Sequence, residues 1–589
     1  MNVIATTVTK TTLTEALESQ LGDPNNPGNP LSFAYSQTID ETEQFPEAAI
    51  RWLYDHQLAR HYVPEELGGS FHSFAELGEV IRVLSRRDVS SAVAFSTLFW
   101  SFLAWVGGTD EQKRWLANYI MERQGTMCLA YSERQHGADL AASDTVALRT
   151  ADGFEITGEK WPINRATVGG LCFVLATTDR TAGPRGLSLF MLDKGELDPK
   201  RFSNLPKILT HGMRGSDISG IKFENCPVSA RSLLGGEGGG LQLALRGFQI
   251  TRALCAAISL GAGDTALRTT LKFAEDRKLY DELVIDLPHA AAVLSDAFLD
   301  LLICDCVTNS GLRAFHVVPE QSSLWASIVK YFVPTTIETM IQNLSVVLGA
   351  RYYMREEHES GAFQRVLRDA AVVSLFDGST VVNLHALMLQ FRHLARRRGV
   401  RGDQGSRLRQ IFEMNTTVPP WNGQKLSLVS TQANSALEGV EYSLEQLKSE
   451  RSRNAADLAE IDRILAFGEE LMQQIGVHNA KFIESEFEHG HLQSAAMFRA
   501  ARRYCALHAA ASCLHAWIWN QTSSSSFFAR GAWLIPALAR IFDKHLDIHH
   551  DDVIDASRPE VLQELRKLYR DNCMFSVSAT ALGATEAAL

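Results

Sequence analysis

Residues 146–157 read VALRTADGFEIT, and they decide the fold because they interrupt a helical pattern with a β-type one. Apolar residues occupy alternate positions on both sides of Asp152-Gly153, a dipeptide that favours a tight turn between antiparallel strands. The stretch therefore predicts a β-hairpin. Apolar runs typical of buried strands follow at 171–178 (LCFVLATT), 187–192 (LSLFML) and 218–223 (ISGIKF).

Helical periodicity surrounds this β region on both sides, because apolar residues there recur every three or four positions. The chain is expected to be mainly α with a central β domain. After the β region, long helical segments are predicted at 241–277, 290–312 and 324–348. A basic, glycine-containing stretch at 396–409 (RRRGVRGDQGSRLR) then predicts a linker or an exposed bend. The predicted units are an N-terminal helical domain (1–125), a middle β domain (126–234), a helical bundle (235–398) and a C-terminal helical extension (410–589).

The composition is that of an ordinary globular protein. Hydrophobic residues make up 46% of the 589 residues and the net charge is −11, so no global positive field attracts nucleic acid. The nine cysteines are scattered without CxxC pairs, which indicates free thiols in a reducing compartment. No export signal is visible at the N-terminus, and we expect a cytoplasmic protein.

Two apolar stretches raise the question of a membrane. Residues 89–109 (VSSAVAFSTLFWSFLAWVGGT) are long enough to span a bilayer, but their hydroxyl groups and Gly-Gly favour a helix buried in a large bundle. Residues 527–542 (FFARGAWLIPALARIF) are amphipathic, and packing on the bundle is favoured over lying on a membrane surface. No transmembrane segment is expected.

Three local clusters are candidates for chemistry. The glycine-rich 235–240 suggests a phosphate loop, but without the flanking motif a flexible β-to-helix junction is favoured. Residues 545–555 (HLDIHHDDVID) crowd imidazoles and carboxylates without a ligand spacing, so a solvated helix end is favoured and no metal is predicted. Phe376-Asp377-Gly378 places an acid at a glycine turn after an apolar run, as a buried general base or as a helix cap.

From about Phe45 to Arg397, several motifs in the right order resemble the acyl-CoA dehydrogenase family. The matching segments are 63–69 (VPEELGG), 108–116 (GTDEQKRWL), 132–139 (SERQHGAD), 158–161 (GEKW), 214–217 (RGSD) and 367–370 (LRDA) followed by 376–379 (FDGS). The resemblance implies an N-terminal helical domain, a β-barrel or sandwich, and a C-terminal four-helix bundle, to which this chain adds a helical domain.

The resemblance also implies an FAD-dependent oxidoreductase that acts on the CH–CH bond of an acyl thioester, carried by CoA or by an acyl carrier protein. A base removes the α-proton while the β-hydride passes to flavin N5, and Asp377 matches that base. Its main-chain N–H would polarise the thioester carbonyl in the manner of an oxyanion hole. The implied FAD-binding positions are Leu129, Tyr131, Ser132, Gly137, Trp161, Ile163, Arg277, Tyr280, Gly349 and Ser379, and the implied substrate positions are Ala138, Thr251, Arg252 and Gly378.

Arg277 and Tyr280 match family residues that reach the FAD of a neighbouring subunit, which implies a homodimer or a homotetramer. Electrons would leave to a separate electron-transfer acceptor. The sequence also departs from the family pattern: Asp377 replaces the usual glutamate, Ile163 replaces a hydroxyl residue near flavin N5, and Gly349 is the only glycine kept of a pair. These departures predict a specialised acyl group or one tethered to a carrier protein.

Two alternatives remain. One is a flavin-dependent oxidase or monooxygenase on the same fold. The other is a catalytically impaired relative that acts as a binding protein. Some long relatives bind DNA through a C-terminal extension, but residues after Val400 carry 19 Lys plus Arg against 23 Asp plus Glu, which disfavours nucleic acid.

Overall fold

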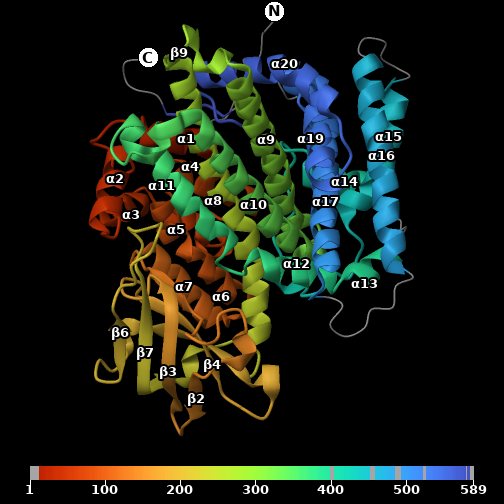
Figure 1. The fold of residues 1–589 in the computed structure, drawn as a ribbon. Coiled ribbons are helices and arrows are strands. Elements are labelled where there is room, and N and C mark those ends of the chain that lie inside the picture. The colour runs from red at the N-terminus through yellow and green to blue at the C-terminus, as the bar shows by residue number, and fades with distance from the viewer. Residues whose placement is uncertain are drawn as a thin grey trace, which may run out of the picture.

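The computed structural model describes residues 12–397, 403–451, 458–483, 493–521, 526–578 and 580–583. It is mainly α-helical, with one larger sheet that projects from a mass of helices (Figure 1). The predicted class, mainly α with a central β region, is confirmed. Residues 398–402 of the predicted linker lie outside the described residues.

The N-terminal region is helical, and its helices begin where a side chain can cap them. Ser73 and Thr109 each accept a hydrogen bond from the third residue after them, which satisfies an otherwise free amide of α4 and of α7. The helices are α1 (Leu13–Leu21), α2 (Phe33–Thr42), α3 (Glu47–Asp55), α4 (Phe74–Arg87), α5 (Val89–Ser96), α6 (Ser101–Gly107) and α7 (Asp110–Met121).

The β region contains the predicted hairpin. Val146 lies opposite Thr157 in the antiparallel pair β2–β3, and the turn falls at Asp152-Gly153 as the sequence predicts. The eight-stranded sheet runs β6-β7-β3-β2-β4-β5-β8, with β1 parallel to β4. The strands are β1 (Met127–Ala130), β2 (Val146–Arg149), β3 (Gly153–Asn164), β4 (Leu171–Thr177), β5 (Leu187–Asp193), β6 (Phe202–Leu205), β7 (Ile218–Ser229) and β8 (Leu233–Leu234).

Three long helices form the centre of the molecule, and all three were predicted from periodicity. The glycines before α8 form the expected β-to-helix junction, since Gly235, Gly236 and Gly238 have positive φ angles of 75–85°. The elements are α8 (Gly240–Asp276), the hairpin β9 (Lys278–Leu279) and β10 (Glu282–Leu283), α9 (Pro288–Val317), α10 (Ser322–Leu348), α11 (His358–Ala370), α12 (Thr380–Met388) and α13 (Phe391–Arg396).

Most helices of the C-terminal extension lie on the opposite side of this bundle from α1 to α3, whereas the end of the chain returns to α1, where the Gly583 amide donates to Glu18 at 3.4 Å (Figure 1). Arg540 of α19 makes a bidentate ion pair with Asp300 of α9, with both N···O distances at 2.7 Å. Near the C-terminus, Asp305 accepts hydrogen bonds from Ser576 and from the amide of Val577. The helices are α14 (Gln404–Phe412), α15 (Ser435–Arg451), α16 (Leu458–Ile483), α17 (Ala495–Asn520), α18 (Ser526–Arg530), α19 (Leu534–Leu546) and α20 (Asp551–Arg570).

The apolar stretches are buried inside the protein. Residues Val89–Gly107 and Gly240–Asp276 are long and apolar enough to cross a membrane, as core helices also are, and 100% and 78% of their most apolar 18-residue windows are buried here. In 527–542, Phe527, Phe528 and Phe542 are buried against neighbouring helices, as the packing interpretation predicted. The 545–555 cluster lies at the junction of α19 and α20, where His549 is exposed and paired with Asp543.

Candidate active site

The acidic turn 376–379 connects α11 to α12 and holds Asp377 in a strained backbone conformation. Asp377 has a φ of 55° and Gly378 a φ of 100°, both in the left-handed region that favours glycine. Asn383 of α12 fixes the turn from one side, because its side-chain amide donates to the carbonyl oxygens of Gly378 at 2.8 Å and Ser379 at 2.9 Å. The Asp377 side chain is thereby presented toward α8.

Helix α8 fixes the turn from the other side. Arg252 donates from Nε to the main-chain carbonyl oxygen of Asp377 at 2.8 Å, and Cys255 places Sγ 3.8 Å from Asp377 Oδ2. Thr251 is fully buried on the same helix. A Cβ added to Gly378 would lie 2.7 Å from the Arg252 guanidinium, so a side chain at this position would displace the group that holds the turn.

The Asp377 carboxyl is half-buried, and its surroundings shift its proton affinity. Burial raises the pKa of Asp377, and the positive charges of Lys330 and Arg252 oppose that rise. Burial also raises the pKa of the Cys255 thiol to about 12, so the thiol stays protonated and can donate toward the carboxylate. A carboxyl with a raised pKa, held beside a neutral donor, is suited to accept and return a proton.

Tyr131, which directly follows β1, brings the β region to the same place. Its ring is buried and meets Phe248 of α8 edge-on, with ring centroids 5.6 Å apart. Burial and the nearby Asp377 charge raise the pKa of Tyr131. Its hydroxyl is buried and makes no hydrogen bond to any residue in the described part of the chain. The end of β1, α8 and the acidic turn therefore converge.

The loop after Tyr131 is held by a buried ion pair. Glu133 lies 2.7 Å from Lys160 Nζ and also accepts from the Ser143 and Thr145 hydroxyls and from the Asp144 and Thr145 amides. Burial would raise the pKa of Glu133, but Lys160 and these donors outweigh it and lower the pKa to about 2. Glu133 also forms a carboxylate and imidazole group with His136 and Asp144, with ligand atoms within 4.8 Å. Both Glu133 oxygens already accept hydrogen bonds from the loop. The role of this group is therefore to stabilise the loop.

This loop and β3 leave a surface that suits a flavin. Gly137 and Ala138 are exposed, and a Cβ on Gly137 would meet no atom within 4 Å. Trp161 of β3 is half-buried and donates from its amide to the carbonyl oxygen of Ser132 at 2.9 Å, which places the indole beside the loop. The unpaired Tyr131 hydroxyl, the open loop and the half-buried indole, over which Arg134 lies at 4.4 Å, are consistent with a bound ring system. Leu129 on β1 is half-buried.

Other predicted residues lie apart from Asp377. Arg277 and Tyr280 are exposed, Tyr280 by 92%, at the far end of α8, about 38 Å along the helix from Arg252. Gly349 follows α10 and is also exposed. Ile163 is buried in the core of the sheet with Phe154 and Phe190. Thr251, Arg252, Asp377 and Gly378 are brought together, whereas Arg277, Tyr280 and Gly349 are presented at the surface.

Two residues of the site were not predicted from the sequence. Cys255 follows Thr251 by four residues, a spacing that puts both on one face of α8 once Thr251 is chosen. Lys330 is a lone cation within an apolar helical run, and the structure places its side chain under the acidic turn. A single charge in a helix predicted to be buried was the available signal for the second.

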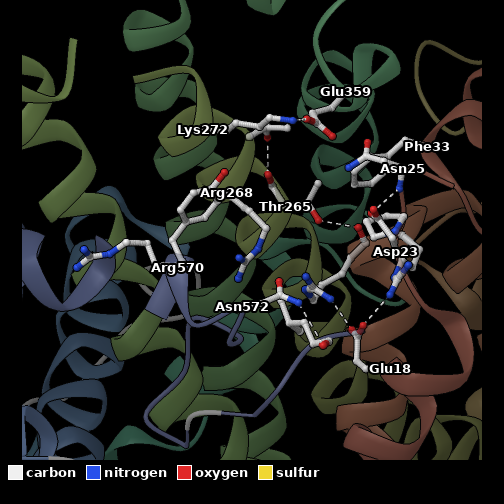
Figure 2. Close-up of a pocket in the computed structure, with 16 residues that line it drawn as sticks. Glu18, Asp23, Asn25, Phe33, Thr265, Arg268, Lys272, Glu359, Arg570 and Asn572 are labelled. Atoms are coloured by element: carbon white, nitrogen blue, oxygen red, sulfur yellow. Dashed lines mark hydrogen bonds and ion pairs between the residues drawn. The ribbon is translucent and has the colours of Figure 1, made fainter. Parts of the chain in front are cut away.

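A separate cavity of about 360 Å³ lies where α1, α8, α11 and α20 meet, and none of the predicted site residues lines it (Figure 2). Its charged groups are mostly paired: Glu18 binds Arg86 and Arg87, and Lys272 binds Glu359. Thr265, at its wall, is about 20 Å along α8 from Arg252. This cavity lies at the interface between the N-terminal helix and the end of the chain.

Three parts of this architecture match domains of known proteins. The acyl-CoA dehydrogenase N-terminal domain matches residues 33–123, the middle domain 128–226 and the C-terminal domain 238–390. A cyclohex-1-ene-1-carbonyl-CoA dehydrogenase of Geobacter metallireducens is 27% identical over 346 residues, which cover 58% of this chain and 89% of that protein.

Solved structures share the fold. Butyryl-CoA dehydrogenase from Megasphaera elsdenii matches with a TM-score of 0.58 and 20% identity, covering 65% of this chain and 98% of that one. A prolyl acyl carrier protein oxidase matches with a TM-score of 0.53 and 22% identity, covering 59% of this chain and 91% of that one.

Fold and site thus define a flavin-dependent oxidoreductase that acts on CH–CH bonds. The chain belongs to the acyl-CoA dehydrogenase family, whose members depend on FAD, and it carries additional C-terminal helices beyond the family domains.

Proposed function

We propose that this protein oxidises the Cα–Cβ bond of an acyl thioester, with Asp377 as the base. The observation that carries the proposal is the convergence on Asp377: its backbone is fixed by Arg252, its carboxyl faces Cys255, and Tyr131 approaches from the β region. In the described residues we find no second carboxylate on the adjoining face of α8, where Gln249, Thr251 and Arg252 stand.

The reaction balances with one proton and one hydride. The Asp377 carboxylate takes the proton from Cα, the Cβ–H bond breaks with its electron pair leaving as hydride, and a Cα–Cβ double bond forms. The loop after Tyr131 and Trp161 would hold FAD, which when bound would supply the acceptor for that hydride. The Asp377 main-chain N–H makes no hydrogen bond to another described residue, so it is available to the thioester carbonyl as charge develops on that oxygen.

The thioester is presented by CoA or by an acyl carrier protein, and both present the same reacting group. Support for either comes from the relatives, since one is named as acting on a CoA ester and one fold neighbour as an acyl carrier protein oxidase. Asp377 is shorter than glutamate by one C–C bond, about 1.5 Å. This shortening favours an acyl group whose α-carbon sits closer to the turn, and hence a specialised substrate.

We further propose that the chain works as a homodimer or homotetramer. Arg277 and Tyr280 are exposed and about 38 Å along α8 from the acidic turn, which supports a role toward the cofactor of a neighbouring subunit. Light scattering of the flavin-loaded protein tests this. A monomer that retains flavin would contradict the shared-site part of the proposal.

The experiment is an anaerobic titration of the purified flavoprotein with matched panels of acyl-CoA and acyl-carrier-protein thioesters. Loss of flavin absorbance near 450 nm with one panel supports dehydrogenation and identifies the carrier. Protein without flavin, or flavin that no thioester reduces, would contradict the function and leave the binding-protein alternative.

One observation bears on the oxidase alternative. Ile163 has an aliphatic side chain, so this position offers no hydroxyl to the flavin. The side chain is 2% exposed and lies inside the sheet core. Whether reduced enzyme passes electrons to a separate electron-transfer protein or to oxygen is decided by measuring reoxidation rates with each acceptor.

A further inference from the structure

Lys330 of α10 is a fully buried lysine that makes no close ion pair with a carboxylate in the described part of the chain. Its side chain is 0% exposed, and none of the ion pairs within 4 Å found among the described residues includes it. Burying an ammonium without a counter-charge in direct contact costs free energy, so the presence of a lysine at this position needs an explanation. Helix α10, which carries it, passes directly beneath the segment that leads into Asp377.

The ammonium contacts that segment at two points. Lys330 Nζ donates to the main-chain carbonyl oxygen of Val373 at 2.6 Å, and it lies 4.4 Å from the centroid of the Phe376 ring. Val373 and Phe376 precede Asp377 by four residues and one residue. A cation against an aromatic face and a carbonyl dipole is held favourably, so Lys330 fixes both the start and the end of the approach to the acidic turn.

The charged and titratable groups that face Lys330 come from three elements. Arg252 and Cys255 belong to α8, Glu338 to α10 itself, and Asp377 to the turn. Burial lowers the pKa of Lys330, while Cys255 and Asp377 oppose that change and Arg252 adds to it. Glu338 lies two helical turns further along α10, and burial raises its pKa. Asp377 is therefore the acid through which a charge on Lys330 acts on the reaction.

We propose that Lys330 is a positioning residue for the base: its buried ammonium fixes the 373–376 approach and keeps the Asp377 side chain in the carboxylate form that accepts the α-proton. This inference rests on the proposed function, because it assigns Lys330 a part in the same proton transfer. Among the groups that oppose the rise in the pKa of Asp377, the Lys330 charge is the strongest, ahead of Thr251 and Arg252, which supports this role.

The test compares three variants at this position. Lys330→Gln keeps a donor for the Val373 carbonyl but removes the charge, Lys330→Met removes both, and Lys330→Arg keeps the charge. Ser327→Ala serves as the matched control, since Ser327 is buried on the same helix and, among the described residues, its hydroxyl bonds only to the Ser323 carbonyl. The rate of anaerobic flavin reduction by a thioester identified with the wild type is measured from pH 5 to 9, together with flavin content and Tm.

In Lys330→Gln we expect the pH midpoint of reduction to move upward by at least one pH unit, with flavin content near that of the wild type. Lys330→Arg and Ser327→Ala should keep the wild-type midpoint. A Lys330→Gln enzyme whose rate falls equally at every pH, with an unmoved midpoint, would overturn the proposal and leave only a structural role. A wild type that no thioester reduces would instead contradict the proposed function, so the two failures are distinct.

A second measurement does not depend on turnover. We expect the loss in Tm of Lys330→Met combined with Asp377→Asn, at pH 8, to be smaller than the sum of the two single losses, because the two charges act on each other. Strictly additive losses would contradict the proposed interaction.

Discussion

Arg252 Nε donates a hydrogen bond of 2.8 Å to the main-chain carbonyl oxygen of Asp377, so α8 holds the backbone of the acidic turn, while Cys255 of the same helix lies 3.8 Å from the carboxylate. A base whose backbone is fixed in this way keeps its reach toward a bound α-carbon constant. Positional errors of about 1 Å can cost a hundredfold in rate.

Arg252→Met should slow flavin reduction by about tenfold to a hundredfold, because the turn that carries Asp377 loses its fixed carbonyl. Stopped-flow spectroscopy at saturating thioester measures the rate of flavin reduction. Gln242→Ala, which changes an exposed residue of the same helix, is the control. A variant that reduces its flavin at the wild-type rate would show that the turn holds its shape without Arg252.

Gly378→Ala should destabilise the protein by about 1–3 kcal/mol, since a side chain at a φ of 100° is strained and its Cβ would meet the Arg252 guanidinium. Gly476→Ala is the matched control: it is a helical glycine of α16 with no atom within 4 Å of an added Cβ, and it should stabilise by about 0.5–1 kcal/mol. Urea unfolding of both variants checks the contrast in sign. Equal effects would refute the steric argument.

Glu133→Gln should release flavin at neutral pH, because the loop after Tyr131 loses its ion pair with Lys160. The pKa of Glu133 is lowered to about 2 in the folded protein, below the ordinary value of about 4.3. The stability this provides is therefore present above pH 4.3 and is lost as the pH falls toward 2. Flavin content after gel filtration, with the exposed Glu196→Gln as control, measures the effect. Full flavin retention by Glu133→Gln would remove the loop from cofactor binding.

Arg540→Ala should destabilise the protein by about 3 kcal/mol, because it removes the bidentate partner of the buried Asp300 carboxylate and leaves only Lys544 beside it, with Nζ 3.1 Å from Oδ2. Arg499→Ala, at an exposed position on α17, should stay within about 0.5 kcal/mol. Urea unfolding curves of the two variants measure their free energies of unfolding. A loss below 1 kcal/mol for Arg540→Ala would mean that this ion pair contributes little to holding the extension against α9.

Most of the fold follows from periodicity. The hairpin around Asp152-Gly153 and the helices α8, α9 and α10 were predicted within a few residues, because alternation and helical spacing are local properties of the chain. The packing of the extension was not predictable, since the Arg540–Asp300 and Ser576–Asp305 contacts join residues more than 200 positions apart. No local pattern encodes such pairs.

Some residues of the site could also be predicted from the sequence, and others could not. Asp377, Thr251 and Arg252 were found through ordered motifs, and the structure brings them together. Cys255 and Lys330 lie outside those motifs and acquire a role only when α8 and α10 close around the turn. A buried lysine in an apolar helix has the same sequence pattern as a lysine that extends to solvent, and only the tertiary contacts separate the two.

The most direct test is anaerobic reduction of Asp377→Asn, which keeps the size of the side chain and removes its ability to take a proton. Using a thioester that bleaches the wild-type flavin, we expect the variant to bind flavin fully and to be reduced at least a thousandfold more slowly, in line with the loss of a positioned base. Bleaching at the wild-type rate would show that another group removes the α-proton, and it would contradict the role of Asp377.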